Sequence, residues 1–138
     1  MREILFRGKR LDNGEWVEGA FLNDRNGAFY ICPAVSDISY GDSGDRRRIG
    51  CWYKVYPSTV GQYTGLKDKN GQRIFEGDIV KTDKFSEPNK QYIIKYDLQF
   101  GAFIGQDRYN VYFVTFDGDS GDFEVIGNIT DNPELLEK

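Results

Sequence analysis

The sequence contains no histidine among its 138 residues. Ser-His-Asp and Cys-His nucleophiles both depend on an imidazole base, so neither arrangement can form here. Cysteine is almost as scarce: Cys32 and Cys51 make no Cys-x-x-Cys pair, and no imidazole is present to complete a zinc set. We therefore expect a protein that is not an enzyme, with no catalytic residue, no metal site and no cofactor.

Long apolar runs are also missing. The N-terminus offers only the three-residue stretch 4–6, which is far shorter than the apolar core of a signal peptide. No segment approaches the roughly 20 apolar residues of a membrane span. We expect a cytoplasmic protein with no membrane partner, in which both cysteines are reduced, buried and unreactive.

Proline and methionine are few, at four and one, whereas aromatic residues make up 15% of the chain and glycine occurs 16 times. Aromatic side chains bury large areas, and glycines permit tight turns, so this balance favours short strands over long helices. The pattern predicts an all-β fold, a small sandwich or barrel, with one short C-terminal helix starting at Pro133 after an Asn132 cap. Predicted strands cover residues 4–6, 15–22, 28–32, 51–56, 78–81, 91–96, 101–105, 109–116 and 123–127.

The net charge of −4 is unevenly distributed. Residues 1–61 hold nine basic and eight acidic side chains, and residues 62–138 hold nine and fourteen. We divide the chain there, into a smaller N-terminal β unit (1–61) and a C-terminal unit (62–138). The asymmetry could favour contact between the halves or between copies of the chain, although two solvated surfaces are the simpler interpretation.

The most informative segment is 59–81, which contains four glycines and the pair Asn70-Gly71. Asn-Gly predicts a hairpin with a type I′ turn, which needs positive φ at both central residues. Residues 6–14 align without gaps to 63–71, and both segments then reach two apolar residues followed by Glu-Gly. We predict the same hairpin unit in both halves, with one extra residue absorbed by a β-bulge in the second. Convergence on common turn chemistry is the alternative.

These segments resemble the YopX family, whose members are uncharacterised proteins of bacterial phages and prophages. The resemblance is carried by residues 6–9, 14–19, 60–71, 74–80 and 125–136, and it spans nearly the whole chain. It implies a β-rich protein of a bacterial host cell whose second half is a small SH3-type barrel. No enzymatic activity is established for the family, so the resemblance implies no catalytic residue.

Arg46, Arg47 and Arg48 form the only dense basic cluster. Tyr40, Trp52 and Tyr53 lie near it in sequence, and basic residues beside aromatic ones are typical of single-strand nucleic-acid binders. The folded chain could add Arg7, Lys9 and Arg10 to the same groove. A solvated loop or a contact between copies is the simpler interpretation, because the net charge is negative.

Carboxylates offer two further sites. Glu76 and Asp78, two residues apart, would share one strand face and could hold a metal ion or act as acid and base, although a solvated strand end is favoured. The segment 117–122 hints at a calcium loop, but the fifth, sixth and twelfth positions do not match an EF-hand, so a hairpin turn is the better interpretation.

Together these observations favour a non-catalytic binding module that forms homo-oligomers. The halves are small, with 61 and 77 residues, and a domain of about 60 residues buries only about 60% of its unfolded surface, so packing against another half or subunit helps. A nucleic-acid-binding accessory protein that uses Arg46, Arg47 and Arg48 is the alternative, and a metal-dependent enzyme comes third.

Overall fold

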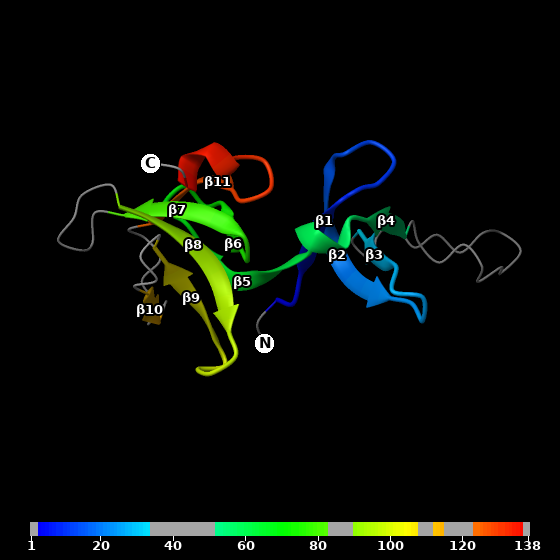
Figure 1. Cartoon of the computed structure of the whole chain (residues 1–138), viewed down its shortest axis with the longest axis horizontal. Helices are drawn as coiled ribbons and strands as arrows, with labels where there is room; N and C mark the ends of the chain where they lie inside the picture. Colours follow the sequence, from blue (N-terminus) through cyan, green and yellow to red (C-terminus); the bar gives the residue numbers. More distant parts are fainter. Residues whose placement is uncertain (1–2, 34–51, 83–89, 108–111, 115–122, 137–138) are drawn as a thin grey trace, which may run out of the picture. The chain divides into compact units, whose positions relative to one another are not determined.

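The computed structural model describes residues 3–33, 52–82, 90–107, 112–114 and 123–136 (Figure 1). The chain divides into two compact units, Met1–Gln62 and Tyr63–Lys138. Their boundary falls inside strand β5 (Gly61–Lys67).

Unit 1 is an antiparallel sheet in the order β4-β3-β2-β1-β5, to which β5 contributes its first residues. A 3-10 helix, η3, precedes β5. The other elements are β1 (Phe6–Lys9), β2 (Trp16–Asn23), β3 (Phe29–Cys32), β4 (Tyr53–Val55) and η3 (Pro57–Thr59).

Backbone contacts between β4 and the end of β1 hold unit 1 together. Arg10 forms an isolated antiparallel bridge with Val55. The Leu11 N–H donates to the Lys54 carbonyl at 2.9 Å, and the Tyr56 N–H donates to the Lys9 carbonyl at 2.9 Å. The chain thus returns to its first strand, and Val55 becomes almost fully buried.

Three phenylalanines extend this packing. The Phe6 and Phe21 rings lie 5.3 Å apart, and Phe21 meets Phe29 edge-on at 5.1 Å. Each ring comes from a different strand, so the pairs link β1, β2 and β3. Stacked and edge-on aromatic pairs stabilise a sheet beyond the area they bury.

Unit 2 begins with β5, which pairs with β6 and then leads to a sheet in the order β10-β9-β8-β7-β11. A 3-10 helix ends the unit. Its elements after β5 are β6 (Arg73–Phe75), β7 (Asp78–Thr82), β8 (Lys90–Asp97), β9 (Ala102–Gln106), β10 (Tyr112–Val114), β11 (Phe123–Asn128) and η4 (Pro133–Leu136).

The core of unit 2 is apolar and draws on four of its strands. Its buried members are Ile74, Val80, Tyr92, Ile94 and Phe123, and Val125 packs against them. Tyr92 and Ile94 occupy alternate positions of β8, so they lie on the same face of the sheet. That face of β8 is therefore the one turned to the core.

The turn between β5 and β6 differs from the type I′ turn predicted at Asn70-Gly71. The Gly71 N–H donates to the Asp68 carbonyl at 3.0 Å, and the Asp68 N–H donates to the Gln72 carbonyl at 2.8 Å. The central residues are therefore Lys69 and Asn70, and Gly71 follows them at φ 81°. This is the longer loop, a type I turn followed by a left-handed glycine.

The β2–β3 turn uses the same arrangement. Asp24 accepts the Gly27 N–H on its carbonyl, and Gly27 has φ 82°. The Oδ1 atoms of Asp24 and Asp68 each accept two further backbone N–H groups at 2.9 Å. The turn that recurs in this chain is therefore the one that begins at Asp24 and again at Asp68.

The predicted echo between residues 6–14 and 63–71 is looser. Both segments form a hairpin whose glycine has positive φ, Gly14 in one and Gly71 in the other. The first turn closes differently, by a bond from the Gly14 N–H to the Arg10 carbonyl. The second hairpin also has a register shift on β5 between Tyr63 and Lys67, which places the bulge before the turn.

The all-β prediction is confirmed: the fold consists of two antiparallel sheets. Among the described residues there is no α-helix and no closed barrel, and the predicted C-terminal helix is the 3-10 turn η4. Of the predicted strand 109–116, the structure describes residues 112–114, which form β10. No described helix has the length and apolar character required to cross a membrane.

Candidate functional site

Among the residues of unit 2 that the structure describes, the most exposed large apolar side chains lie at the turn between β8 and β9. Leu98 is 89% exposed, Phe100 49% and Tyr96 44%. Leu98 and Phe100 belong to the turn itself, and Tyr96 lies near the end of β8. Large exposed apolar groups that gather at one place are typical of interaction sites. We name residues 95–103 the β8–β9 tip.

The β8–β9 tip has a defined conformation. Asp97 Oδ1 accepts the N–H groups of Gln99 at 2.7 Å and Phe100 at 3.1 Å, and the Asp97 carbonyl accepts the Gly101 N–H at 2.8 Å. These bonds fix the turn on both sides of Leu98. The apolar side chains are therefore presented from an ordered turn, which reduces the entropy lost on binding.

Aromatic packing stiffens the base of the tip. Tyr96 and Phe103 are partners across β8 and β9, and their rings meet edge-on with centroids 5.2 Å apart. They lie on the same sheet face as Ile94, since positions alternate along β8. The core-facing side of β8 thus continues into the tip, where Tyr96 is half exposed.

Unit 1 carries a second surface, on which cations lie over aromatic rings. The Arg7 guanidinium lies 4.7 Å from the centre of the Trp16 ring, and Lys9 Nζ lies 5.6 Å from it. Lys9 and Trp16 are direct partners across β1 and β2. Arg7 and Lys9 are alternate residues of β1, so strand pairing brings both to one ring.

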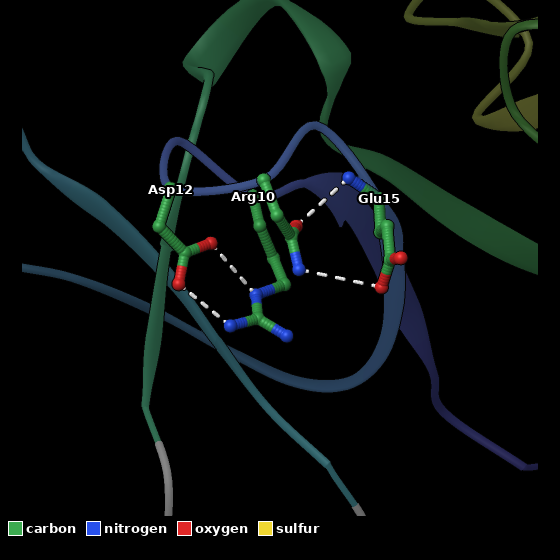
Figure 2. Close-up of polar contacts among 4 residues, drawn as sticks. Arg10, Asp12 and Glu15 are labelled. Atoms are coloured by element: carbon green, nitrogen blue, oxygen red, sulfur yellow. Dashed lines mark hydrogen bonds and ion pairs between the residues drawn. The ribbon is translucent and has the colours of Figure 1, made fainter.

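Arg10 is engaged in a different way. Its Nε and Nη2 atoms donate to the two carboxylate oxygens of Asp12 at 2.9 and 2.6 Å, a bidentate pair that Figure 2 shows. The guanidinium also lies 3.9 Å from the centre of the Tyr53 ring. These hydrogen bonds raise the pKa of Arg10 and lower the pKa of Asp12. The pair with Asp12 occupies two of the five guanidinium N–H groups, so a phosphate would compete with that carboxylate for Arg10.

The same turn is closed on its other side by Asn13. Its Oδ1 accepts the Glu15 N–H at 2.9 Å, and its Nδ2 donates to Glu15 Oε2 at 3.3 Å (Figure 2). Two acidic side chains, Asp12 and Glu15, therefore flank Arg10. They reduce the positive potential that this part of unit 1 could offer to a nucleic acid.

Glu76 and Asp78 do not belong to one strand, because β6 ends at Phe75 and β7 begins at Asp78. Gly77, at φ 91°, lies in the turn between β6 and β7, so the two carboxylates do not share a strand face as predicted. Asp78 is only 1% exposed, and its Oδ2 accepts the Phe75 N–H at 2.7 Å. This carboxylate holds the turn together. Within the described ranges, no three acidic or thiol side chains form a group that could hold a metal ion.

Several predicted sites fall outside the described residues. Arg46, Arg47 and Arg48, the candidate nucleic-acid contacts, are among them, as are Cys51 and the acidic segment 117–122. Cys32 is described and is buried, as predicted.

Comparison with known proteins finds a family whose members resemble this chain. The sequence profile of a family described as "YopX protein" matches residues 5–137. The chain is also similar to protein EF1440 from Enterococcus faecalis, whose crystal structure is known. The two sequences are 30% identical and the two structures superpose with a TM-score of 0.62, over 99% of this chain and 99% of that one. No curated protein matches the sequence.

Proposed function

This chain belongs to the YopX family, and we propose that it is a non-catalytic binding module that assembles with copies of itself in the cytoplasm of a bacterial host. The observation that carries the proposal is the β8–β9 tip. It exposes three large apolar side chains, two on an ordered turn and Tyr96 at the adjoining end of β8, which supports a role in binding another macromolecule.

The strand order of unit 2 supports the SH3-type comparison drawn from the family resemblance. Strands β7 to β10 follow one another as antiparallel neighbours, and β11 returns to pair with β7. A five-stranded meander whose last strand lies beside its first is the order found in SH3-type barrels. Binding residues are often carried by loops and turns on a rigid scaffold, which agrees with a binding role for the β8–β9 tip.

Sedimentation velocity over a range of protein concentrations tests the proposal directly. We expect the weight-average sedimentation coefficient to rise with concentration, and the rise to persist at moderate salt because apolar contacts are weakly screened. A single monomeric species at every concentration would refute the self-association.

The cation–aromatic surface of unit 1 favours a second candidate, the binding of single-stranded nucleic acid. Trp16 could stack on a base while Arg7 and Lys9 contact phosphates, and Arg46, Arg47 and Arg48 would add to the charge.

A gel-shift assay at low salt with single-stranded DNA and RNA decides this candidate. Binding should weaken with salt and with replacement of Arg46, Arg47 and Arg48 by alanine. The absence of any shift at low salt would remove it.

A further inference from the structure

Strand β8 is longer than its neighbour β7. The two strands pair only between Lys90 and Ile93 of β8, whereas β9 pairs with β8 as far as Asp97. Beyond Ile94, the side of β8 away from β9 therefore has no partner strand in the described part of the chain. Figure 1 shows the β8–β9 hairpin extending away from β7. An unpaired strand edge of this kind is a template for pairing with another chain.

The backbone groups along this edge can be assigned. The Gly77 N–H donates to the Ile94 carbonyl at 2.8 Å, so the backbone of Ile94 faces the β7 side. The Asp97 carbonyl faces the opposite way, because it accepts the Gly101 N–H. Backbone groups alternate along a strand, so the N–H and C=O of Tyr96 point to the unpaired side.

The side chains around Tyr96 are self-complementary. Lys95 is exposed and precedes it, and Asp97 follows it. If two copies pair antiparallel with Tyr96 opposite Tyr96, Lys95 of each copy lies opposite Asp97 of the other. Both ion pairs then lie on the same face of the joint sheet, and opposite charges that face each other across strands stabilise pairing.

We propose that the unpaired edge of β8 joins two copies of this chain around a twofold axis at Tyr96. The two Tyr96 residues exchange N–H···O=C bonds, and the two Lys95–Asp97 pairs fix the register. Leu98 and Phe100 of each copy supply apolar area beside the contact. The inference rests on the proposed self-association and specifies the surface that produces it.

The contact is short, and this sets its strength. Its interface lies at the small end of specific protein contacts, so association is weak and is observed at high protein concentration. The register is nevertheless specific. A slip by one residue would place Lys95 opposite Tyr96, and a slip by two would place Lys95 opposite Lys95 or Asp97 opposite Asp97, where like charges destabilise pairing.

The charge pattern is tested in the full chain by sedimentation velocity with Lys95→Glu, which turns both ion pairs into repulsions. We expect association to weaken by about tenfold or more. The matched control is Lys54→Glu, the same charge change at an exposed position of β4 in unit 1. Adding Asp97→Asn to Lys95→Glu removes the repulsion and keeps Oδ1 for the turn, so association should recover in part.

The register is tested by oxidative cross-linking of Lys95→Cys protein mixed with Asp97→Cys protein. The proposed pairing brings positions 95 and 97 of different copies within about 5 Å, so the mixture should form a cross-linked dimer rapidly. Each variant alone should cross-link slowly, because identical positions other than 96 lie farther apart. The native chain under the same oxidant controls for Cys32 and Cys51.

The outcomes separate the two levels of the proposal. A native chain that stays monomeric at all concentrations overturns the self-association and this interface together. A native chain that associates while Lys95→Glu behaves like Lys54→Glu and the mixture forms no rapid cross-link overturns the interface alone. Weakening by Lys95→Glu together with rapid cross-linking only in the mixture supports both.

Discussion

Asp24 and Asp68 show how one residue type can make the same local bonds and differ in reach. Each carboxylate accepts the N–H groups two and four positions ahead and so fixes its own turn. Asp68 is also buried, at 6% exposure, and its second oxygen accepts the Val125 N–H at 3.0 Å. The local role follows from the sequence Asp-x-Asn-Gly. The bond to Val125 could not be predicted in this way, because it forms only when the fold brings β11 beside the turn.

Gly71 is a position where backbone conformation alone decides tolerance. Nothing lies within 4 Å of where a Cβ would be, so the φ of 81° is the only obstacle to a side chain. We expect Gly71→Val to cost about 2 kcal/mol and Gly71→Asn clearly less, since asparagine adopts this region more easily. Thermal unfolding, monitored by circular dichroism, measures the loss of stability in both variants. Equal melting temperatures for the two variants would contradict the assignment.

At Gly19, in contrast, the space available for a side chain decides whether a substitution is tolerated. A Cβ built there would lie 1.8 Å from the Cys32 carbonyl oxygen on the neighbouring strand β3. Gly19→Ala should therefore cost about 3 kcal/mol or more, because backbone has to move. Urea unfolding of this variant, with Gly14→Ala as a control for loss of glycine in an open turn, gives the comparison. A small loss at Gly19 would show that β2 and β3 can separate without penalty.

The β5–β6 turn covers the outer edge of β11. Asp68 binds the Val125 N–H, and the Lys69 N–H donates to the Phe123 carbonyl at 2.9 Å. These are two of the groups that an edge strand would otherwise present to another chain. Glu124, between them, lies 3.4 Å from the ammonium groups of Lys69 and Lys81. The chain itself thus covers the outer edge of β11, whereas the side of β8 away from β9 has no partner strand at Tyr96 among the described residues.

Asp68→Ala tests this cover. The substitution leaves the N–H groups of Asn70, Gln72 and Val125 without their carboxylate partner, and we expect a loss of about 2–3 kcal/mol. Asp24→Ala is the matched control, because it removes the same turn bonds and, in place of a bond to a distant strand, only a 3.3 Å bond from the nearby Tyr30 hydroxyl. Its melting temperature should fall less. A fall as large as that of Asp68→Ala would show that the bond to Val125 contributes little.

Several strands could be predicted from sequence because aromatic and branched residues alternate between glycine-rich turns. Residues 78–81, 91–96 and 123–127 lie within β7, β8 and β11. Strand starts were less accurate: β1 begins at Phe6, where residues 4–6 were expected. Ile4 is exposed and Leu5 is half-buried, and neither belongs to a strand, because strand pairing with β5 and β2 begins only at Phe6. Local composition does not show where a partner strand starts.

Acid should destabilise the fold, because some carboxylates bind protons less readily in the folded chain than in the unfolded one. The hydrogen bond from Lys81, followed by the charge of Lys69, lowers the pKa of Glu124 below the ordinary glutamate value of 4.5. The Ala28 N–H chiefly lowers the pKa of Asp24 below 3.8. Since the unfolded chain takes up protons first, this stability is complete above the ordinary values and is lost as pH falls through the lower, folded ones.

We therefore expect a melting temperature that is level between about pH 5 and pH 7 and falls below about pH 4.5. Glu124→Gln removes one of the groups responsible, so its melting temperature should fall less steeply over the same acid range. Differential scanning calorimetry of both proteins measures the two slopes. Parallel curves would show that Glu124 contributes nothing to the pH dependence.

The sequence predicted some residues of the candidate sites but not their arrangement. Leu98 and Phe100 lie inside Asp97–Gly101, a turn-like segment where apolar residues are unexpected, and that mismatch was the available signal. The unpaired edge at Tyr96 depends on where β7 begins, which is a property of strand pairing. The basic residues Arg7 and Lys9 were identified, but their stacking on Trp16 follows from the β1–β2 register.

The bond between Asp68 and Val125 spans 57 positions of the chain, and this distance matters during synthesis. When the ribosome has made the β5–β6 hairpin, the strand that the Asp68 carboxylate will hold does not yet exist. A nascent or prematurely terminated chain that lacks β11 leaves both this acceptor and one side of β7 open to chaperones and proteases. Strand β11, once it has left the exit tunnel, therefore protects a turn that was translated much earlier.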